Sequence, residues 1–278
     1  MASPSLDATQ LDRYSRHVIM EEVGPAGQAA LLDSRVLVVG AGGLGSPAIQ
    51  YLAAAGVGEL GIADDDTVER SNLQRQTVHR DADVGRPKVE SAAAFVARLN
   101  PDVEVRRHEL RVGPENVASL LADYDLVVDG SDNFRTRYLL NDACTLAGVP
   151  FSHGAVHRFE GQVTTFSGGA DGPCYRCPFP EAPPPGTIED CATAGVLGVL
   201  PGTVGAIQAT EAIKHLVGVG DSLDGRLLVY DALGTRFEEV PVRRDPDCPV
   251  CGEGGIDSVA EVEYADTCAV AAPADAAD

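Results

Sequence analysis

The sequence predicts an α/β fold built on a doubly wound, mostly parallel sheet. Two apolar runs, Arg35–Val39 and residues 125–129, have the length and composition of strands that are buried on both faces. Segments with helical periodicity alternate with such runs over the first 150 residues, as in parallel sheets with crossover helices. With 278 residues, the chain is long enough for one large domain.

The expected elements follow one another in a regular order. Helical spacing over 8–32 predicts N-terminal helices ahead of the first strand, and Pro87 suits the first turn of a later helix. The other elements are a helix at 46–55, a strand at 59–63, an irregular stretch to 86, a helix at 87–99, a strand at 103–107, a helix at 114–122, the strand at 125–129 and a helix through 146.

The pattern changes after Phe151. Shorter extended runs at 162–166, 226–230 and 236–242 predict a mixed or antiparallel C-terminal extension of the sheet. Gly and Pro dominate residues 168–190, which we expect to form a crossover loop.

The chain is expected to divide into one folded domain and a short tail. We assign residues 1–252 to the domain and 253–278 to an acidic, partly disordered tail, in which 259–264 adds a short strand.

The composition excludes several classes of function. A net charge of −21 with only two lysines argues against nucleic-acid binding. No apolar run approaches the length of a membrane span and no signal segment opens the chain, so we expect a cytoplasmic protein without a membrane partner. The excess of carboxylates suggests a salt-loving source, because salt screens their repulsion.

A glycine turn follows the first strand. Gly40, Gly42 and Gly45 satisfy G-x-G-x-x-G, with Gly43 between them, at the point where a strand meets a helix. Backbone N–H groups and the positive helix end can bind phosphate there. The alternatives are a tight turn without a nucleotide and the dinucleotide site of an NAD(P)-dependent oxidoreductase.

Polar residues downstream favour ATP. Asp64 ends the second strand, where an acid would hold a ribose of either NAD or ATP. Further carboxylates, including Asp66, and the cation of Arg75 suit a magnesium polyphosphate instead.

Lys88 stands near a helix start and can reach a phosphate; the alternative is a solvated surface lysine. Asp132 follows the strand at 125–129 beside Asn133, and for both the alternative role is capping the next helix.

Five motifs together resemble one enzyme family. They are RYSRH (13–17), GAGGLGS (40–46), DDDTVERSNLQRQ (64–76), GRPK (85–88) and SDNFRTR (131–137). Over residues 8–251 the sequence is identified as a member of the ubiquitin-activating-type, ThiF-like adenylyltransferases. This family includes the bacterial molybdopterin-synthase and thiamine sulfur-carrier activators, and the likeness is strongest to the haloarchaeal activators of small archaeal modifier proteins.

The resemblance implies roles that the residue pattern alone does not. It implies a homodimer in which Arg16 reaches into the site of the partner subunit, and an Mg²⁺ held by Asp132. The implied catalytic residues are Arg16, Arg75, Asp132 and Cys191. The implied ATP-binding residues are Gly42, Gly43, Gly45, Asp64, Asp66, Ser71, Asn72, Leu73, Gln74, Arg75, Gln76, Lys88, Asp132 and Asn133.

The implied reaction is adenylation of a protein. The C-terminal glycine carboxylate of a ubiquitin-fold protein ending in Gly-Gly attacks the α-phosphorus of ATP and releases pyrophosphate, for protein modification, molybdopterin synthesis or tRNA thiolation. No further domain follows the core in this sequence, so we expect a separate protein to donate any sulfur. The alternatives are an NAD(P)-dependent oxidoreductase, an activator of a carboxylate on a tRNA nucleoside, and a catalytically silent dimeric scaffold.

Two C-x-x-C pairs indicate a structural zinc site. Cys174 with Cys177 and Cys248 with Cys251 can supply four thiolates, and a shared Zn²⁺ would clamp the crossover region to the end of the core. Two separate thiol or redox pairs are the alternative.

The remaining cysteines and histidines fall into different classes. Cys191 resembles the family's acceptor cysteine, which takes the activated carboxylate as a thioester or takes part in sulfur transfer. We expect Cys144 to pack in the core, assign no partner to Cys268, and interpret His153 and His157 as structural.

Overall fold

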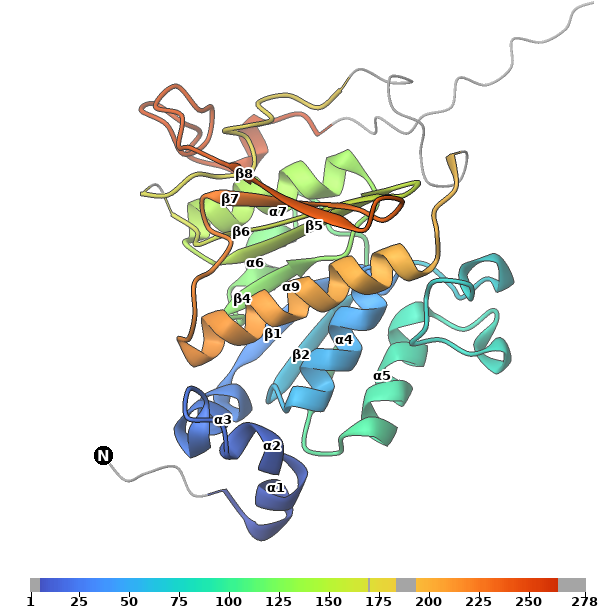
Figure 1. Cartoon of the computed structure of the whole chain (residues 1–278). Helices are drawn as coiled ribbons and strands as arrows, with labels where there is room; N and C mark the ends of the chain where they lie inside the picture. Colours follow the sequence, from blue (N-terminus) through green and yellow to red (C-terminus); the bar gives the residue numbers. More distant parts are fainter. Residues whose placement is uncertain (1–5, 170, 184–193, 265–278) are drawn as a thin grey trace, which may run out of the picture.

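The computed structural model describes residues 6–169, 171–183 and 194–264 (Figure 1). Its strands form one sheet in the order β3-β2-β1-β4-β5-β6-β7-β8. The strands are β1 (Arg35–Val39), β2 (Glu59–Ala63), β3 (Glu104–His108), β4 (Leu126–Asp129), β5 (Phe151–His157), β6 (Glu160–Phe166), β7 (Arg226–Asp231) and β8 (Arg236–Pro241). Neighbours from β3 to β5 are parallel, whereas β6, β7 and β8 pair antiparallel. This arrangement confirms the predicted fold class.

Helices cover both faces of the parallel part of the sheet (Figure 1). One face carries α4 (Gly45–Ala55), α5 (Lys88–Leu99) and α9 (Val199–Val217), and the other carries α6 (Val117–Leu121) and α7 (Phe134–Ala147). Alternate residues of β1 therefore enter different cores. Val36 and Val38 pack with α4 and α9, while Leu37 and Val39 pack with α6 and α7. Burial on both faces explains why these strands are apolar throughout.

The N-terminal helical region is broken into three short helices. They are α1 (Ala8–Arg13), α2 (Ser15–Val18) and α3 (Gly24–Asp33). Asp7 starts α1 with a capping box, Tyr14 separates α1 from α2 at φ −98° and ψ 14°, and Gly24 begins α3 with a positive φ of 59°.

Two elements in the C-terminal half of the chain were not predicted from the sequence. The long helix α9 contains Pro201 and several glycines, which obscure its helical pattern; the proline lies in the first turn, where helices tolerate it. The prediction of a strand at 259–264 is wrong. Val259–Glu261 forms the 3-10 helix η3, because the side chain of Ser258 accepts from the Ala260 N–H and Val259 packs against the core beside α7.

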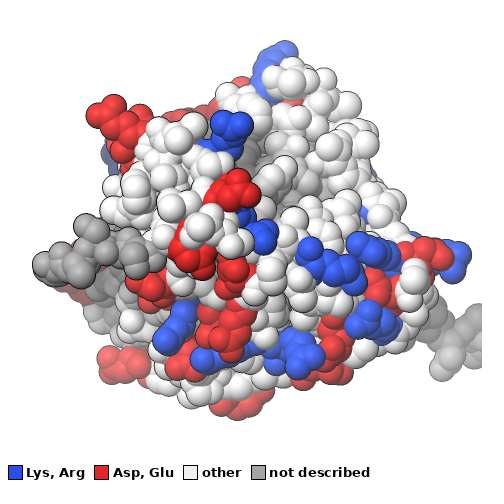
Figure 2. Space-filling model, turned by 90° about the horizontal axis from the view of Figure 1, so that it is seen from below, with Lys and Arg blue, Asp and Glu red and all other residues white. Residues whose placement is uncertain are grey.

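Charged side chains of both signs lie next to one another on part of the protein surface. Figure 2 shows this on one face of the molecule, together with an area at its upper right that lacks charged side chains. Within the described residues, no helix combines the length and the apolar character that a membrane span requires.

Candidate functional site

A cavity of about 360 Å³ lies at the carboxyl edge of the parallel strands. Residues that follow β1, β2 and β4 all line it, as expected for the ligand site of an open α/β sheet. The structure brings together nine residues that the sequence predicts for nucleotide binding: Gly42, Gly43, Asp64, Asp66, Arg75, Gln76, Lys88, Asp132 and Asn133.

The glycine turn closes the end of β1. Gly40 has a φ of +93°, and a Cβ at this position would lie 2.7 Å from the Gly130 carbonyl oxygen. A Cβ at Gly45 would collide with the Gly40 carbonyl oxygen. Gly45 is therefore required for the close approach of turn and helix, and it does not line the cavity itself.

Asp64 links the glycine turn to Lys88. Its carboxylate accepts from the N–H groups of Ala41 at 2.8 Å and of Asp66 at 2.9 Å, and Lys88 Nζ lies 4.0 Å away. Burial raises the pKa of Asp64, and the charge of Lys88 partly opposes that rise. Lys88 also pairs with Asp66 at 2.7 Å while only 6% of the lysine is exposed. The alternative of a solvated surface lysine is therefore wrong.

His79 is hydrogen-bonded to the glycine turn on the side away from the cavity. Its Nε2 lies 2.9 Å from the Ala41 carbonyl oxygen and its Nδ1 lies 2.9 Å from Ser91 Oγ. Burial lowers the pKa of His79, so the neutral ring is favoured. No local pattern in the sequence marks this histidine, because its partners are 12 and 38 residues away.

Residues after β4 form the opposite wall. Asp132 is exposed at the cavity, and Asn133 lines it while its side chain accepts from the Thr136 N–H and caps α7. For Asn133 the capping role is thus confirmed. Arg137, one turn further along α7, also lines the cavity, although we did not assign it a role from the sequence. The sequence did offer one indication of this placement: Arg137 follows Asn133 by four residues, so the two lie on the same side of the helix.

Several other predicted residues lie away from the cavity wall. Ser71 and Asn72 make local contacts around the 3-10 helix η1 (Arg70–Asn72), and neither Leu73 nor Gln74 lines the cavity. Arg16 is exposed on α2 and is not part of the wall. Cys191, like Cys268, lies outside the described residues. The roles of these residues stay predictions.

Acidic groups at the end of β2 could hold a cation. The carboxylates of Asp64, Asp65 and Asp66 have oxygens within 4.8 Å of one another. Carboxylate oxygens suit Mg²⁺, and the phosphates of a nucleotide in the same cavity would complete its coordination. Asp132 lies across the cavity and is not a member of this group.

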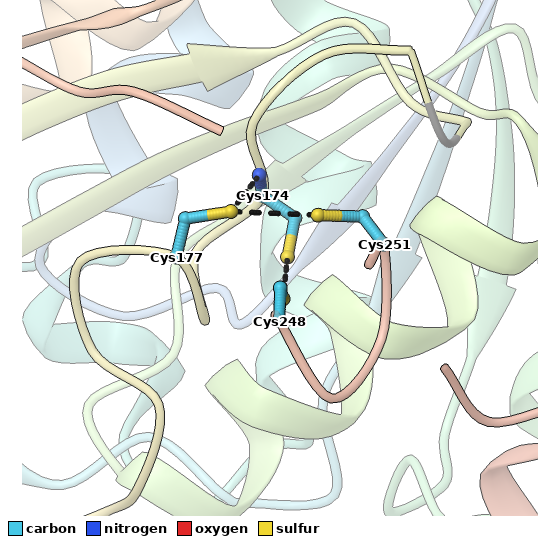
Figure 3. Close-up of side chains that lie close together, drawn as sticks. All are labelled: Cys174, Cys177, Cys248 and Cys251. Carbon is cyan, nitrogen blue, oxygen red and sulfur yellow. Dashed lines mark hydrogen bonds between the residues drawn. The ribbon is translucent and has the colours of Figure 1, made fainter. Parts of the chain in front are cut away.

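The four predicted metal ligands converge on one point (Figure 3). Their sulfur atoms lie within 4.8 Å of one another; Cys174 and Cys248 are 3.6 Å apart, and Cys177 and Cys251 are 3.4 Å apart. Disulfide sulfurs would be about 2.05 Å apart. Tetrahedral zinc with Zn–S bonds of about 2.3 Å sets its sulfurs roughly 3.8 Å apart. Each close contact joins the two pairs, so the alternative of separate thiol pairs is wrong.

The surroundings of the cluster also suit thiolates. The N–H groups of Cys174 and Asp245 both donate to Cys177 Sγ at 3.4 Å. These residues fit a structural zinc ion, since all four ligand positions are taken by cysteine.

The structural assignments of two other residues are confirmed. Cys144 is fully buried in the core around α7, and burial raises its pKa. His153 is 1% exposed and its Nδ1 lies 2.9 Å from Asp129 Oδ2.

Known proteins resemble this chain in sequence and in fold. It matches the ThiF family over residues 14–250. It is 68% identical over 266 residues to the SAMP-activating enzyme E1 of Haloferax volcanii, covering 96% of this chain and 98% of that protein. It is 52% identical over 248 residues to the sulfur carrier protein adenylyltransferase of Thermus thermophilus, covering 88% and 92%. The structure of E. coli MccB with ATP shares the fold, with a TM-score of 0.76 and 22% identity over 87% of this chain and 75% of that one. The chain therefore belongs to the ThiF family.

Proposed function

We propose that this protein uses ATP to adenylate the C-terminal glycine carboxylate of ubiquitin-fold modifier or sulfur-carrier proteins. The observation that carries the proposal is the cavity at the carboxyl edge, which unites a phosphate-binding turn with Lys88, Arg75 and Asp64. The names of the two relatives, an activating enzyme and a sulfur carrier adenylyltransferase, support the same reaction.

The chain's own groups suit each part of the nucleotide. Asp64 is placed to accept from a ribose hydroxyl, and backbone N–H groups of the turn can donate to the phosphates. Lys88 and Arg75 supply positive charge where negative charge develops as pyrophosphate leaves. A bound Mg²⁺ would neutralise further phosphate charge, with Asp132 or the Asp64–Asp66 carboxylates as its protein ligands. The partner's carboxylate is already ionised at neutral pH, so positioning and electrostatics carry the step.

The proposal is tested by ATP–pyrophosphate exchange with a ubiquitin-fold partner that ends in Gly-Gly. We expect exchange that depends on the partner and is lost with a partner that lacks its last glycine. Lys88→Met should reduce exchange by about 100-fold or more, because it removes a buried cation from the phosphates. The matched control is Lys214→Met, which changes the other lysine of the chain, paired with Glu211 on α9. Exchange without a partner, or none at all, would contradict the proposal.

We further propose that Cys191 accepts the activated acyl group. The thiolate attacks the acyl carbon of the adenylate, the new C–S bond forms, and AMP leaves with the electron pair of the broken C–O bond. Cys191→Ser should leave pyrophosphate exchange intact while partner conjugation and sulfur transfer are lost; Cys144→Ala is the control. A serine variant that conjugates and transfers sulfur normally would refute this role.

The wider organisation is part of the same proposal. Residues 1–252 form the adenylating domain, 168–190 its crossover loop, and 253–278 the tail. The activated partner then serves protein modification, molybdopterin synthesis or tRNA thiolation in the cytoplasm.

A further inference from the structure

Arg137 is a buried cation with an unused donor at the wall of the cavity. The residue is 8% exposed and belongs to the first turns of α7. Its Nε has no hydrogen-bond partner in the described part of the chain, and it forms no ion pair with a carboxylate there. An unpaired buried cation is costly, so such a group beside a cavity indicates an anionic ligand.

Aromatic rings hold the guanidinium in place. Its Cζ lies 4.9 Å from the ring centroid of Phe134 and 5.9 Å from that of Tyr175, and Nη1 lies 3.5 Å from Tyr175 Oη. These contacts restrain the side chain. The buried carboxylate of Asp129 also interacts electrostatically with the guanidinium but forms no ion pair with it, so the positive charge is compensated only in part. The charge remains available to a ligand.

Tyr175 connects Arg137 to the cysteine cluster. It lies between Cys174 and Arg176 in the first C-x-x-C pair, and its ring packs 4.7 Å from that of His153. Its N–H donates to Asn141 Oδ1 at 2.7 Å, which ties the segment to α7. The cysteine pair thus determines where the tyrosine ring lies, and the ring determines where Arg137 lies.

The sheet order separates Arg137 from the other cations of the cavity. Lys88 and Arg75 belong to the segment after β2 and Arg111 follows β3, whereas Arg137 follows β4. The glycine turn after β1 stands between Arg137 and these other cations. With the ribose at Asp64 and the phosphates at the turn, the β4 side is left for the attacking carboxylate. Val156 of β5 lines that side of the cavity.

We propose that Arg137 binds the terminal carboxylate of the incoming protein and that Tyr175 is its positioning residue; this rests on the proposed function. A guanidinium can hold a carboxylate through two parallel hydrogen bonds, which would orient one oxygen toward the α-phosphorus. The carboxylate loses its charge on adenylation, so its ion pair with Arg137 stabilises the bound, unreacted partner protein more than the adenylated product. Loss of Arg137 therefore raises KM for the partner protein more than it lowers kcat.

The test is a thermodynamic cycle on binding. The partner is prepared with a C-terminal carboxylate or a C-terminal carboxamide, and its Kd is measured by calorimetry in the presence of a non-cleavable ATP analogue. We expect amidation to weaken binding to the unchanged protein by about tenfold or more. Arg137→Met should weaken binding of the carboxylate form and make binding almost insensitive to amidation. Arg137→Lys, which keeps the charge but loses the two parallel donors, should show both effects in part. Tyr175→Phe should reduce the sensitivity to amidation in part, whereas Tyr230→Phe on β7 should not.

Each other outcome has a definite meaning. The proposal would be overturned if the free-energy changes caused by substituting Arg137 and by amidating the partner were additive. It would also be overturned if the Arg137 variants bound ATP more weakly but bound the partner protein unchanged. If the unchanged protein shows no partner-dependent exchange, the proposed function fails rather than the role of Arg137. Thermal unfolding monitors the fold, and Arg137→Lys keeps the test valid if Arg137→Met does not fold.

Discussion

At the scale of single residues, buried polar groups shape the cavity at the carboxyl edge of the sheet. Asp64 and Lys88 are nearly buried, and the lysine Nζ lies 4.0 Å from the carboxylate; burial raises the pKa of Asp64 and the charge of Lys88 opposes that rise. The hydrogen-bond partners of His79, Ser91 and the Ala41 carbonyl, are neutral. Its pKa is lowered by burial, and the nearby charges of Lys88 and Asp83 act on it in opposite directions. Such a histidine stabilises the fold only while it is neutral.

The first prediction concerns the acid sensitivity of the glycine turn. A lowered folded pKa means that the contribution of His79 is present above the ordinary histidine value of about 6.5 and is lost as pH falls through the folded value. His79→Gln keeps a donor to the Ala41 carbonyl but cannot be protonated. Between pH 7 and pH 5, we expect the unchanged protein to lose on the order of 1 kcal/mol more unfolding free energy than the variant. Urea denaturation at both pH values measures this, and equal losses would count against it.

At the scale of elements, α7 joins the cavity at the carboxyl edge to the cysteine cluster. Its first turns carry Arg137 into the cavity wall, and Asp142 further along is fully buried. Asp142 accepts two hydrogen bonds from Arg176 at 2.7 Å and one from Tyr264 at 2.8 Å. A buried carboxylate with this many partners ties the C-x-x-C segment to the helix.

The second prediction therefore concerns the cluster as a clamp. Cys248→Ser should reduce zinc below one equivalent and lower Tm by about 5–10 °C, since metal binding contributes to folding free energy. Cys144→Ala, which removes a buried cysteine outside the cluster, should keep one equivalent of zinc. Metal analysis and calorimetry give both values. A purified unchanged protein without zinc would exclude the clamp.

At the scale of the whole molecule, a second cavity bears on the predicted homodimer. A shallow cavity of about 320 Å³ lies between α2, α4 and α9, lined by His17, Tyr51, Ala206 and Ile213 among others. Tyr51 is 56% exposed, and Arg16 stands next to His17. We propose that this face forms the homodimer and that Arg16 crosses into the second subunit's cavity.

The third prediction tests that arrangement. Tyr51→Glu should shift the protein from dimer to monomer in analytical ultracentrifugation, because a buried charge would face an apolar partner surface. Phe237→Glu, on the exposed edge strand β8, should not. Mixing inactive Arg16→Ala and Lys88→Met subunits should restore part of the exchange activity, since one of the two sites in a mixed dimer has both residues intact. No recovery in confirmed mixed dimers would show that Arg16 does not act across the interface.

Most of the fold could be predicted from local pattern, and the exceptions have physical causes. The parallel strands are recognisable because burial on both faces requires apolar residues throughout. Helix α9 is obscured by its glycines, one of which packs so closely that a Cβ on Gly205 would collide with the Leu44 carbonyl. In the segment 259–264, the contact of Val259 with the core and the cap of Ser258 outweigh strand propensity.

The sequence by itself determined the sheet, its carboxyl edge and the cysteines able to bind a metal, because strand pattern, glycine turn and C-x-x-C spacing are local. Only the tertiary structure decided which groups meet. Cys174 and Cys248 are 74 residues apart in the chain, and Lys88 is buried against acids of the segment after β2. Arg137 reaches the cavity with a free donor because Tyr175, held in the cysteine segment, packs against it. Such partners depend on chain segments that come together only on folding.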